Sequence, residues 1–297
     1  MKLFTEIIAL RDHLKEIKFK AAQSNKQLEI GFVPTMGYLH AGHASLLEQA
    51  RKNNDVVVLS IFVNPIQFGA NEDLDKYPRD FEADMALAQQ SGVDIVFMPT
   101  PEEMYPSPTK TYVKVNNLTE NLCGASRPGH FDGVTTVVSK LLHIVNPQRA
   151  YFGQKDAQQL AVITQMVHDL NLDVDIVPCP IIREQDGLAL SSRNVYLSAE
   201  ERQAALVLSQ SLQLVKESTT SSSVVSIGEL RSQIINHIKS ERAADIEYVS
   251  LTLFPQLVEL SDDAKVNEIQ DDILVALAVK FGSTRLIDNV ILTKKGL

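Results

Sequence analysis

The fold of this chain can be inferred from one segment: Gly31-Phe32-Val33-Pro34-Thr35-Met36-Gly37-Tyr38-Leu39-His40-Ala41-Gly42-His43. The apolar residues that end at Val33 are typical of a buried strand. Pro34 and Gly37 then break the strand and predict a turn. Apolar residues at helical spacing follow in 44–50. The stretch therefore predicts a strand, a turn and a helix, with two histidines at the start of the helix.

These two histidines, His40 and His43, would line one side of the first helical turn. Backbone N–H groups and the positive end of the helix dipole lie at the same place, so the pair indicates a phosphate site. Gly42 between them lets backbone and ligand approach closely. Two other interpretations stay open from spacing alone: a histidine near a helix start is commonly a surface or capping residue, and the pair also suits half of a metal site.

The composition is that of a soluble globular protein: 297 residues, 44% hydrophobic and 22% charged. The formal net charge of −9 argues against general binding to nucleic acid or anionic membranes, although a local site can still hold an anionic substrate. The sequence shows neither a signal peptide nor an apolar run of membrane-spanning length. Cys123 and Cys179 lack metal-ligand spacing. We therefore expect a cytoplasmic protein without nucleic-acid or membrane partners.

Strand and helix patterns alternate along the first part of the chain. Apolar runs predict strands at 55–63, 93–98, 150–152 and 174–177, and helical spacing predicts helices at 7–22, 81–90 and 157–170. Residues 111–115 alternate like an edge strand. This α/β pattern predicts a Rossmann-like parallel sheet in a domain of residues 1–184. Strands expected at 246–251, 273–279 and 286–292 predict a smaller C-terminal α+β domain of residues 185–297.

Polar side chains follow several of the predicted strands. Asn64 and Gln67 come after a buried strand, at the edge of a parallel sheet where ligands bind, so we expect them on the same rim as the two histidines. Lys155 lies at a second strand-to-helix junction, where a phosphate would dock. Ser191-Ser192-Arg193 combines two hydroxyls with a guanidinium, which suits a transferring phosphate. Each of these features also has an ordinary alternative. Asn64 and Gln67 can simply stabilise a loop, Lys155 can be a solvated lysine, and Ser191-Ser192-Arg193 can be a common polar loop.

Three motifs, in this order, match one family: Pro34–Gly37 with His40–His43, Phe152–Asp156 with Gln158-Gln159, and Asp186–Asn194. The chain resembles the pantothenate synthetase (pantoate–β-alanine ligase) family, which belongs to the HIGH-motif nucleotidyltransferase superfamily. The resemblance covers nearly the whole length, and Asn64–Phe68 and Arg127–Phe131 also look like family segments. The His-x-Gly-His motif by itself marks only the superfamily, whereas its combination with the other motifs is specific.

This resemblance implies an ATP-dependent, AMP-forming ligase. The carboxylate of pantoate would attack the α-phosphate of ATP, giving pantoyl adenylate and pyrophosphate. The amine of β-alanine would then attack the acyl carbon, releasing AMP and pantothenate. Mg²⁺ is expected with ATP, mostly held by phosphate oxygens and water. The resemblance also implies a homodimer, and we expect the C-terminal domain to close as a lid over ATP.

Catalytic roles follow from the same resemblance. Charge develops on the leaving pyrophosphate, and fixed donors there would lower the barrier. The implied donors are His40, His43, Lys155, Ser191, Ser192 and Arg193. The family assigns the second histidine of its motif, here His43, as a proton donor. We expect electrostatic stabilisation by both histidines, and proton transfer stays open.

Binding roles are implied residue by residue. The ATP site would comprise the backbone at Ile182 together with Met36, Gly37, Tyr38, Leu39, His40, Ala41, Gly42, His43, Gly153, Gln154, Lys155, Asp156, Leu190, Ser191, Ser192 and Arg193. Pantoate would be held by Gln67 and Gln159 in a pocket lined by Met36, and Gln67 would also help to place β-alanine. Asn64 and His130 are further candidates for phosphate or second-substrate contacts. Asp84 matches a metal position of the family, but we expect it to be a helix-surface carboxylate.

Three other functions compete with the ligase. A nucleotidyltransferase that adds AMP or CMP to a phosphorylated acceptor would need a cationic site for that phosphate, whereas Gln67 and Gln159 suit an uncharged, hydroxylated substrate. A non-catalytic nucleotide-binding module would have little use for so many phosphate donors. A transfer-RNA synthetase is disfavoured by the acidic charge and by the lack of an anticodon-binding domain.

Overall fold

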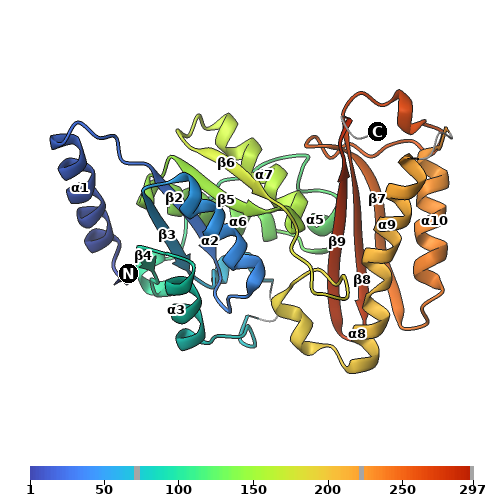
Figure 1. The fold of residues 1–297 in the computed structure, drawn as a ribbon, viewed down its shortest axis with the longest axis horizontal. Helices are drawn as coiled ribbons and strands as arrows, with labels where there is room; N and C mark the ends of the chain where they lie inside the picture. The colour runs from blue at the N-terminus through green and yellow to red at the C-terminus, as the bar shows by residue number, and fades with distance from the viewer. Residues whose placement is uncertain (70–73, 221–223, 295–297) are drawn as a thin grey trace. The chain divides into compact units, whose positions relative to one another are not determined.

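The computed structural model of this protein describes residues 1–69, 74–220 and 224–294 (Figure 1). The chain forms two compact units. The first comprises Met1–Thr119, Gly124–Gln154 and Val162–Pro180, and the second comprises Glu120–Cys123, Lys155–Ala161 and Ile181–Leu297. The domain boundary between residues 184 and 185 stays a prediction.

The first unit is built on a six-stranded sheet with the order β1-β4-β3-β2-β5-β6. Its strands are β1 Lys2–Phe4, β2 Ile30–Thr35, β3 Val56–Ile61, β4 Ile95–Phe97, β5 Arg149–Gly153 and β6 Asp175–Cys179. All of the pairings are parallel, which confirms the predicted Rossmann-like sheet. Ile30, Phe32 and Val58 are fully buried, as expected for central strands covered on both faces. The chain leaves β2 towards β3 on one side and returns to β5 on the other, which is the strand arrangement that creates a ligand crevice.

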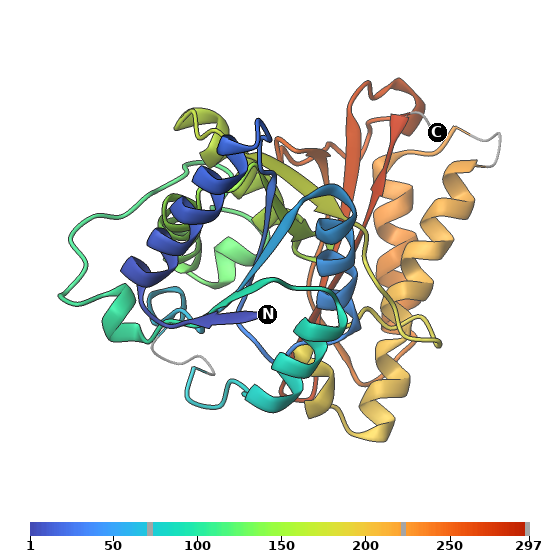
Figure 2. The same cartoon turned by 60° about the vertical axis from the view of Figure 1, so that its left-hand side comes forward.

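Helices follow the strands of this sheet. They are α1 Ile7–Gln23, α2 Ala41–Asn53, α3 Phe81–Gln90, α4 Pro101–Met104, α5 Leu122–Ser126, α6 His130–Val145 and α7 Ala157–Asp169, with short 3₁₀ turns η1 Pro65–Gln67 and η2 Gln154–Asp156. Figures 1 and 2 show α1 and α2 on opposite sides of β2 and β3. Helix α1 packs with α6, and α2 packs with α3. The sheet is thus covered on both faces, which explains why its strands are apolar runs without alternation.

The edge strand predicted at 111–115 is wrong, because these described residues form no strand. Their backbone groups pair with helix α6 instead. The N–H of Val113 donates to Thr136 Oγ1 at 3.0 Å, and the carbonyl of Val113 accepts from Thr135 Oγ1 at 2.6 Å. Since hydroxyls satisfy this backbone, no neighbouring strand is needed.

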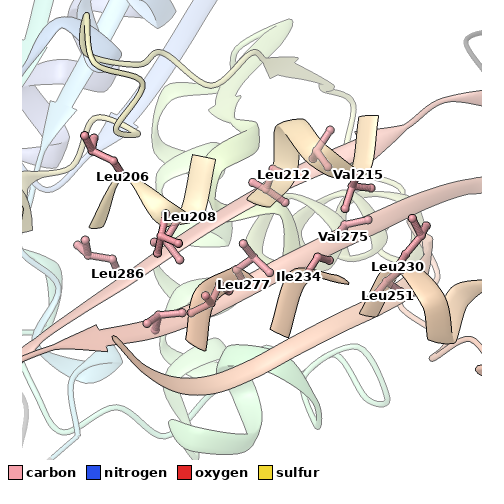
Figure 3. Packing of buried hydrophobic residues seen from close by; sticks show 14 of the residues in the cluster. Leu206, Leu208, Leu212, Val215, Leu230, Ile234, Leu251, Val275, Leu277 and Leu286 are labelled. Carbon is pink, nitrogen blue, oxygen red and sulfur yellow. The ribbon is translucent and has the colours of Figure 1, made fainter. Parts of the chain in front are cut away.

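The second unit is an α+β structure, as predicted. Its antiparallel sheet has the order β7-β8-β9, with β7 Ala244–Phe254, β8 Asp272–Phe281 and β9 Thr284–Leu292. The helices are α8 Ala199–Ala205, α9 Val207–Thr220 and α10 Ile227–Lys239, and the 3₁₀ turns are η3 Ser192–Tyr196 and η4 Val266–Glu268. Figure 3 shows apolar side chains of α9 and α10 packed against those of β7, β8 and β9. This apolar core gives the second unit its own stability.

Candidate active site

The histidine pair caps helix α2. His40 is the N-cap residue, and its Nδ1 accepts the N–H of Gly42 at 3.1 Å. His43 lies one helical turn further along the chain, and its Nδ1 accepts the N–H of His40 at 3.3 Å. The two ring centroids lie 4.1 Å apart. The capping role and the ligand-binding role, which the sequence left as alternatives, are therefore compatible, because each ring uses only one nitrogen as a cap.

Capping also determines which ring atom carries hydrogen. Because Nδ1 of His40 and Nδ1 of His43 accept from N–H groups, a neutral ring must carry its hydrogen on Nε2. Both Nε2 atoms are then donors, which suits an anion. A metal bound at Nε2 would need the hydrogen on Nδ1, where it would face a backbone N–H. Among the residues that the structure describes, no group of three or more metal-binding side chains exists. The half-site for a metal is therefore disfavoured.

The turn before the cap is held by Asp84 of helix α3. Its carboxylate accepts the N–H of Tyr38 at 2.9 Å and the N–H of Leu39 at 2.6 Å. The side chain is only 3% exposed, so the expectation of a helix-surface carboxylate is wrong. Burial raises the pKa of Asp84, and the two N–H groups oppose that shift. Gly37 has φ +84°, and an added Cβ would lie 2.9 Å from Ile61 Cγ2, so this turn requires glycine.

A second group of side chains lies at the end of β3. Asn64 is fully buried, and its Nδ2 donates to Gln67 Oε1 and to the carbonyl of Gly133, both at 3.1 Å. Gln67 Nε2 lies 3.1 Å from the sulfur of Met36, which belongs to the histidine stretch. The phenol of Tyr105 donates to Asn64 Oδ1 at 2.8 Å. This amide cluster and the histidine cap are thus connected through one short stretch of chain, 36–43.

His130 supports this cluster from the start of helix α6. The guanidinium of Arg127 can only donate, so His130 Nε2 accepts from it at 3.0 Å, and His130 Nδ1 then donates to the carbonyl of Gln67 at 2.8 Å. Both ring nitrogens have protein partners. The ring therefore positions the backbone of Gln67, and a direct contact between His130 and a substrate stays a prediction.

Of the remaining candidates, Gly153 ends β5 and Gln154 begins η2, both in the first unit, and those from Lys155 onward belong to the second unit. Lys155 lies on η2, and its carbonyl accepts Asn289 Nδ2 at 2.8 Å. Ser191 caps η3, since its Oγ accepts the N–H of Arg193 at 3.2 Å. The N–H of Leu190 donates to the carbonyl of Ile182 at 3.0 Å. Gln159 lies on α7 and is partly buried.

Sequence reasoning missed the residues that support this second group. Arg183 forms a two-point ion pair with Asp288 at 2.6 and 2.9 Å, and Asp288 is 2% exposed. Asp288 and Asn289 are neighbours on β9, so one strand anchors both Arg183 and the carbonyl of Lys155. Asp288 and Asn289 lie in Arg285–Asn289, a segment that also resembles the family, and this resemblance was the available signal. The predicted convergence of the two groups of candidates on one rim stays a prediction.

Comparisons with known proteins agree on one family. The family model described as pantoate–β-alanine ligase matches residues 2–291. A pantothenate synthetase of Acetivibrio thermocellus is 58% identical over 273 residues, which cover 91% of this chain and 93% of that protein. The solved structure of pantothenate synthetase from Thermus thermophilus is 44% identical with a TM-score of 0.87, covering 98% of this chain and 99% of its own. A pantoate–β-alanine ligase from Francisella tularensis, solved with β-γ ATP and β-alanine, is 33% identical with a TM-score of 0.76, covering 98% and 97%.

Along the part of the chain that the structure describes, no helix combines the length and the apolar character needed to cross a membrane.

Proposed function

The chain belongs to the pantoate–β-alanine ligase family, and from this premise we propose that it joins pantoate to β-alanine with ATP through a pantoyl-adenylate intermediate. The products are pantothenate, AMP and pyrophosphate. The observation that carries this mechanism is the reciprocal cap of His40 and His43. It presents two Nε2 donors at a helix N-terminus, which is where a phosphate chain can be held.

In the first step a carboxylate oxygen of pantoate bonds to the α-phosphorus of ATP. The bond from that phosphorus to the bridging oxygen breaks, and its electron pair leaves with pyrophosphate. Donors that point at the developing charge lower the barrier. We assign this role to His40, His43, Lys155, Ser191, Ser192 and Arg193.

The cap also bears on the role of His43. A neutral ring that gave up its Nε2 hydrogen would become an imidazolate, which is a poor outcome for a proton donor. Hydrogen bonding from Nε2 requires no such change. We therefore favour electrostatic stabilisation by both rings, and full proton transfer would require His43 to carry two hydrogens.

In the second step the amine of β-alanine attacks the acyl carbon, and AMP leaves. Gln67 and Gln159 would hold pantoate beside Met36, and Gln67 would also help to place β-alanine. Gln67 is supported for this role by its burial and by the fixed surroundings of its amide. Asn64 is buried, both hydrogens of its Nδ2 are engaged and its Oδ1 accepts from Tyr105, so we assign it to positioning Gln67, and a direct contact between Asn64 and a substrate stays a prediction.

ATP would be bound by Met36–His43, Gly153–Asp156, the backbone at Ile182 and Leu190–Arg193. Mg²⁺ would arrive with ATP, held by phosphate oxygens and water. The residues described here do not form a protein-made cage for this ion, because both oxygens of Asp84 already accept backbone N–H groups and no acidic or histidine cluster stands beside it. Asp84 therefore takes no part in the proposed steps.

The assembly and setting are part of the same proposal. We propose a homodimer, as the resemblance to the family implies, and we propose that it acts in the cytoplasm. We also propose that the C-terminal domain closes as a lid over ATP, shielding the acyl adenylate from water. If small-angle scattering and protease sensitivity of the Ser191 loop did not respond to ATP plus pantoate, the lid would be rejected.

An assay of AMP formation tests the reaction. Purified protein is given ATP, Mg²⁺ and β-alanine, with pantoate present or absent, and AMP and pyrophosphate are measured together. We expect both products to require pantoate, and AMP to require β-alanine as well. AMP formation that ignores pantoate would refute the ligase assignment.

A further inference from the structure

The Gln67 amide is the last member of a chain of hydrogen bonds that begins at Tyr105. The phenol of Tyr105 lies 2.8 Å from Asn64 Oδ1, and Asn64 Nδ2 lies 3.1 Å from Gln67 Oε1. Tyr105 comes directly after α4, about forty residues from the other two in sequence. The sequence motifs therefore give no hint of this connection.

The direction of this chain is set by the carbonyl of Gly133. A carbonyl oxygen can only accept, so the Asn64 atom that lies 3.1 Å from it must be the amide nitrogen. Asn64 Oδ1 then faces the phenol, which must donate. The second hydrogen of Asn64 Nδ2 goes to Gln67 Oε1. Gln67 is left with its Nε2 turned towards Met36, whose thioether sulfur is only a weak acceptor.

Close packing keeps Gly133 in this position. A Cβ added at Gly133 would lie 2.5 Å from Gln67 Cα and 2.5 Å from the carbonyl oxygen of Ile66. The backbone of helix α6 therefore touches the backbone of η1, and the carbonyl of Gly133 comes within reach of Asn64. The direction of the amide chain is thus determined by backbone atoms, which a rotation of a side chain cannot reverse.

We propose that Tyr105 is a positioning residue that acts through Asn64 to hold the Gln67 amide with Nε2, rather than Oε1, available to an oxygen of the acid substrate. This inference rests on the proposed function, in which Gln67 holds pantoate. It assigns the polarity of that contact: Gln67 donates to a carboxylate oxygen of pantoate, and does not accept a hydroxyl hydrogen.

The surroundings of Tyr105 suit a permanent donor. Burial raises the pKa of the phenol, so the hydroxyl keeps its hydrogen across the working pH range. Lys140 Nζ lies 4.4 Å from the centre of the Tyr105 ring and also donates to the carbonyl of Met104. The ring of Phe62 packs 6.3 Å away. The ring is thus held from several sides while its hydroxyl reaches Asn64.

Tyr105→Phe removes only the first donor of the chain. Asn64 Oδ1 would become a buried acceptor without a partner, and Asn64 would hold Gln67 less firmly. We expect the KM for pantoate to rise about tenfold, with the KM for ATP within about twofold of the unmodified protein. Tyr112→Phe is the matched control, since it removes a hydroxyl from a side chain that is 54% exposed, and it should leave both constants unchanged.

Two changes at Gln67 test the polarity directly. Gln67→Glu keeps an acceptor for Asn64 but offers no donor to the substrate, whereas Gln67→Ala removes both. If Nε2 is the contact, Gln67→Glu should raise the KM for pantoate more than Gln67→Ala does, because the new carboxylate repels the substrate oxygen. If Oε1 is the contact, Gln67→Glu should bind pantoate better than Gln67→Ala, and the proposal is overturned.

The outcomes separate this inference from the proposed function. A Gln67→Ala variant with an unchanged KM for pantoate removes Gln67 from the pantoate site, and the inference falls with that assignment. A raised KM in Gln67→Ala together with an unchanged KM in Tyr105→Phe leaves the proposed function standing and overturns the role of Tyr105. Thermal unfolding accompanies each assay, and if Tyr105→Phe did not fold, the comparison of Gln67→Glu with Gln67→Ala would still decide the polarity.

Discussion

The two strand-to-helix junctions that carry the phosphate-binding candidates are built in different ways. After β2, His40 and His43 cap helix α2 with their own side chains, through hydrogen bonds that span two or three residues. After β5, Lys155 lies on a short 3₁₀ turn whose backbone is held by Asn289, 134 positions further along the chain. The first junction is organised by neighbouring residues, and the second by a distant strand. A substitution at the first junction should therefore act through local hydrogen bonds, and a substitution at the second through a contact with a distant strand.

The largest effect is expected at the local junction. His43→Ala removes an Nε2 donor and also the acceptor for the N–H of His40. Pantoate-dependent pyrophosphate release should fall by about 10²–10³-fold while the fold survives. His168→Ala is the control, because that side chain is 82% exposed. Near-normal pyrophosphate release in His43→Ala would contradict the assignment of the cap as the catalytic phosphate site.

Lys155→Ala tests the second junction at its side chain. The loss of one cation near the leaving group should lower the rate of adenylate formation by about 10²-fold. Thermal unfolding should change little, because the interaction that anchors this residue uses its carbonyl and not its ammonium. A variant that formed adenylate normally would remove Lys155 from the catalytic set.

Asp84→Asn tests the support beneath the local junction. An asparagine can accept one N–H, but its NH₂ would face the other, so either Tyr38 or Leu39 loses a partner. We expect a loss of about 1–3 kcal/mol in the free energy of unfolding and about a tenfold fall in kcat. Glu82→Gln, at an exposed position on the same helix, is the matched control. If both variants behaved alike, the turn would not depend on Asp84.

Asn289→Ala tests the distant anchor of the second junction. The carbonyl of Lys155 would lose its donor, and the lysine would be held less precisely in place. The kcat should fall about fivefold, and it should fall less than in Lys155→Ala, because the ammonium itself remains. Asn267→Ala removes an exposed amide of the same unit and should leave kcat unchanged. An equal loss in Asn289→Ala and Lys155→Ala would mean that the anchor matters as much as the charge.

The smallest effect concerns stability at high pH. Cys179 pairs with Gly153 at the carboxyl end of β6, beside the strand that leads to Lys155. Burial raises the pKa of its thiol from 9.0 to about 11. The folded state therefore favours the protonated thiol, and this contribution is complete below the ordinary pKa and is lost as the pH rises through the folded one.

This contribution can be measured against Cys179→Ala. Below pH 9 the difference in the free energy of unfolding between the two proteins should be constant. Between pH 9 and 11 the unmodified protein should lose about 2 kcal/mol relative to the variant. Denaturant titrations across this range provide the measurement. A difference that stayed constant up to pH 11 would contradict the raised pKa.

The predicted strands and helices were confirmed where the sequence pattern behind the prediction was local. The strand, turn and helix around Pro34 are specified by apolar periodicity and by two breaking residues, and the structure has all three. The edge strand expected at 111–115 is wrong because a strand needs a partner, and alternation cannot reveal whether one exists. Here the hydroxyls of Thr135 and Thr136 take the place of that partner.

The residues of the candidate site differ in the same way: some were predictable from local motifs, and others were not. His40, His43, Gln67 and Lys155 could be named from motifs, since their chemistry and spacing are written along the chain. The burial of Asp84 could not be foreseen, because its carboxylate meets backbone groups that lie 45 and 46 residues earlier. Tyr105 could not be named at all, because only folding brings its hydroxyl to Asn64.

The amino-acid pattern alone was enough to predict a helix that begins with two histidines after a strand of a parallel α/β sheet, and to identify the family that its motifs match. These features depend on periodicity, turn residues and side-chain chemistry over short distances. The folded structure was needed to show which nitrogen of each histidine is a donor, which way the Gln67 amide points, and what holds Lys155. Those properties depend on the direction of single hydrogen bonds, and direction is set by partners that arrive from distant parts of the chain.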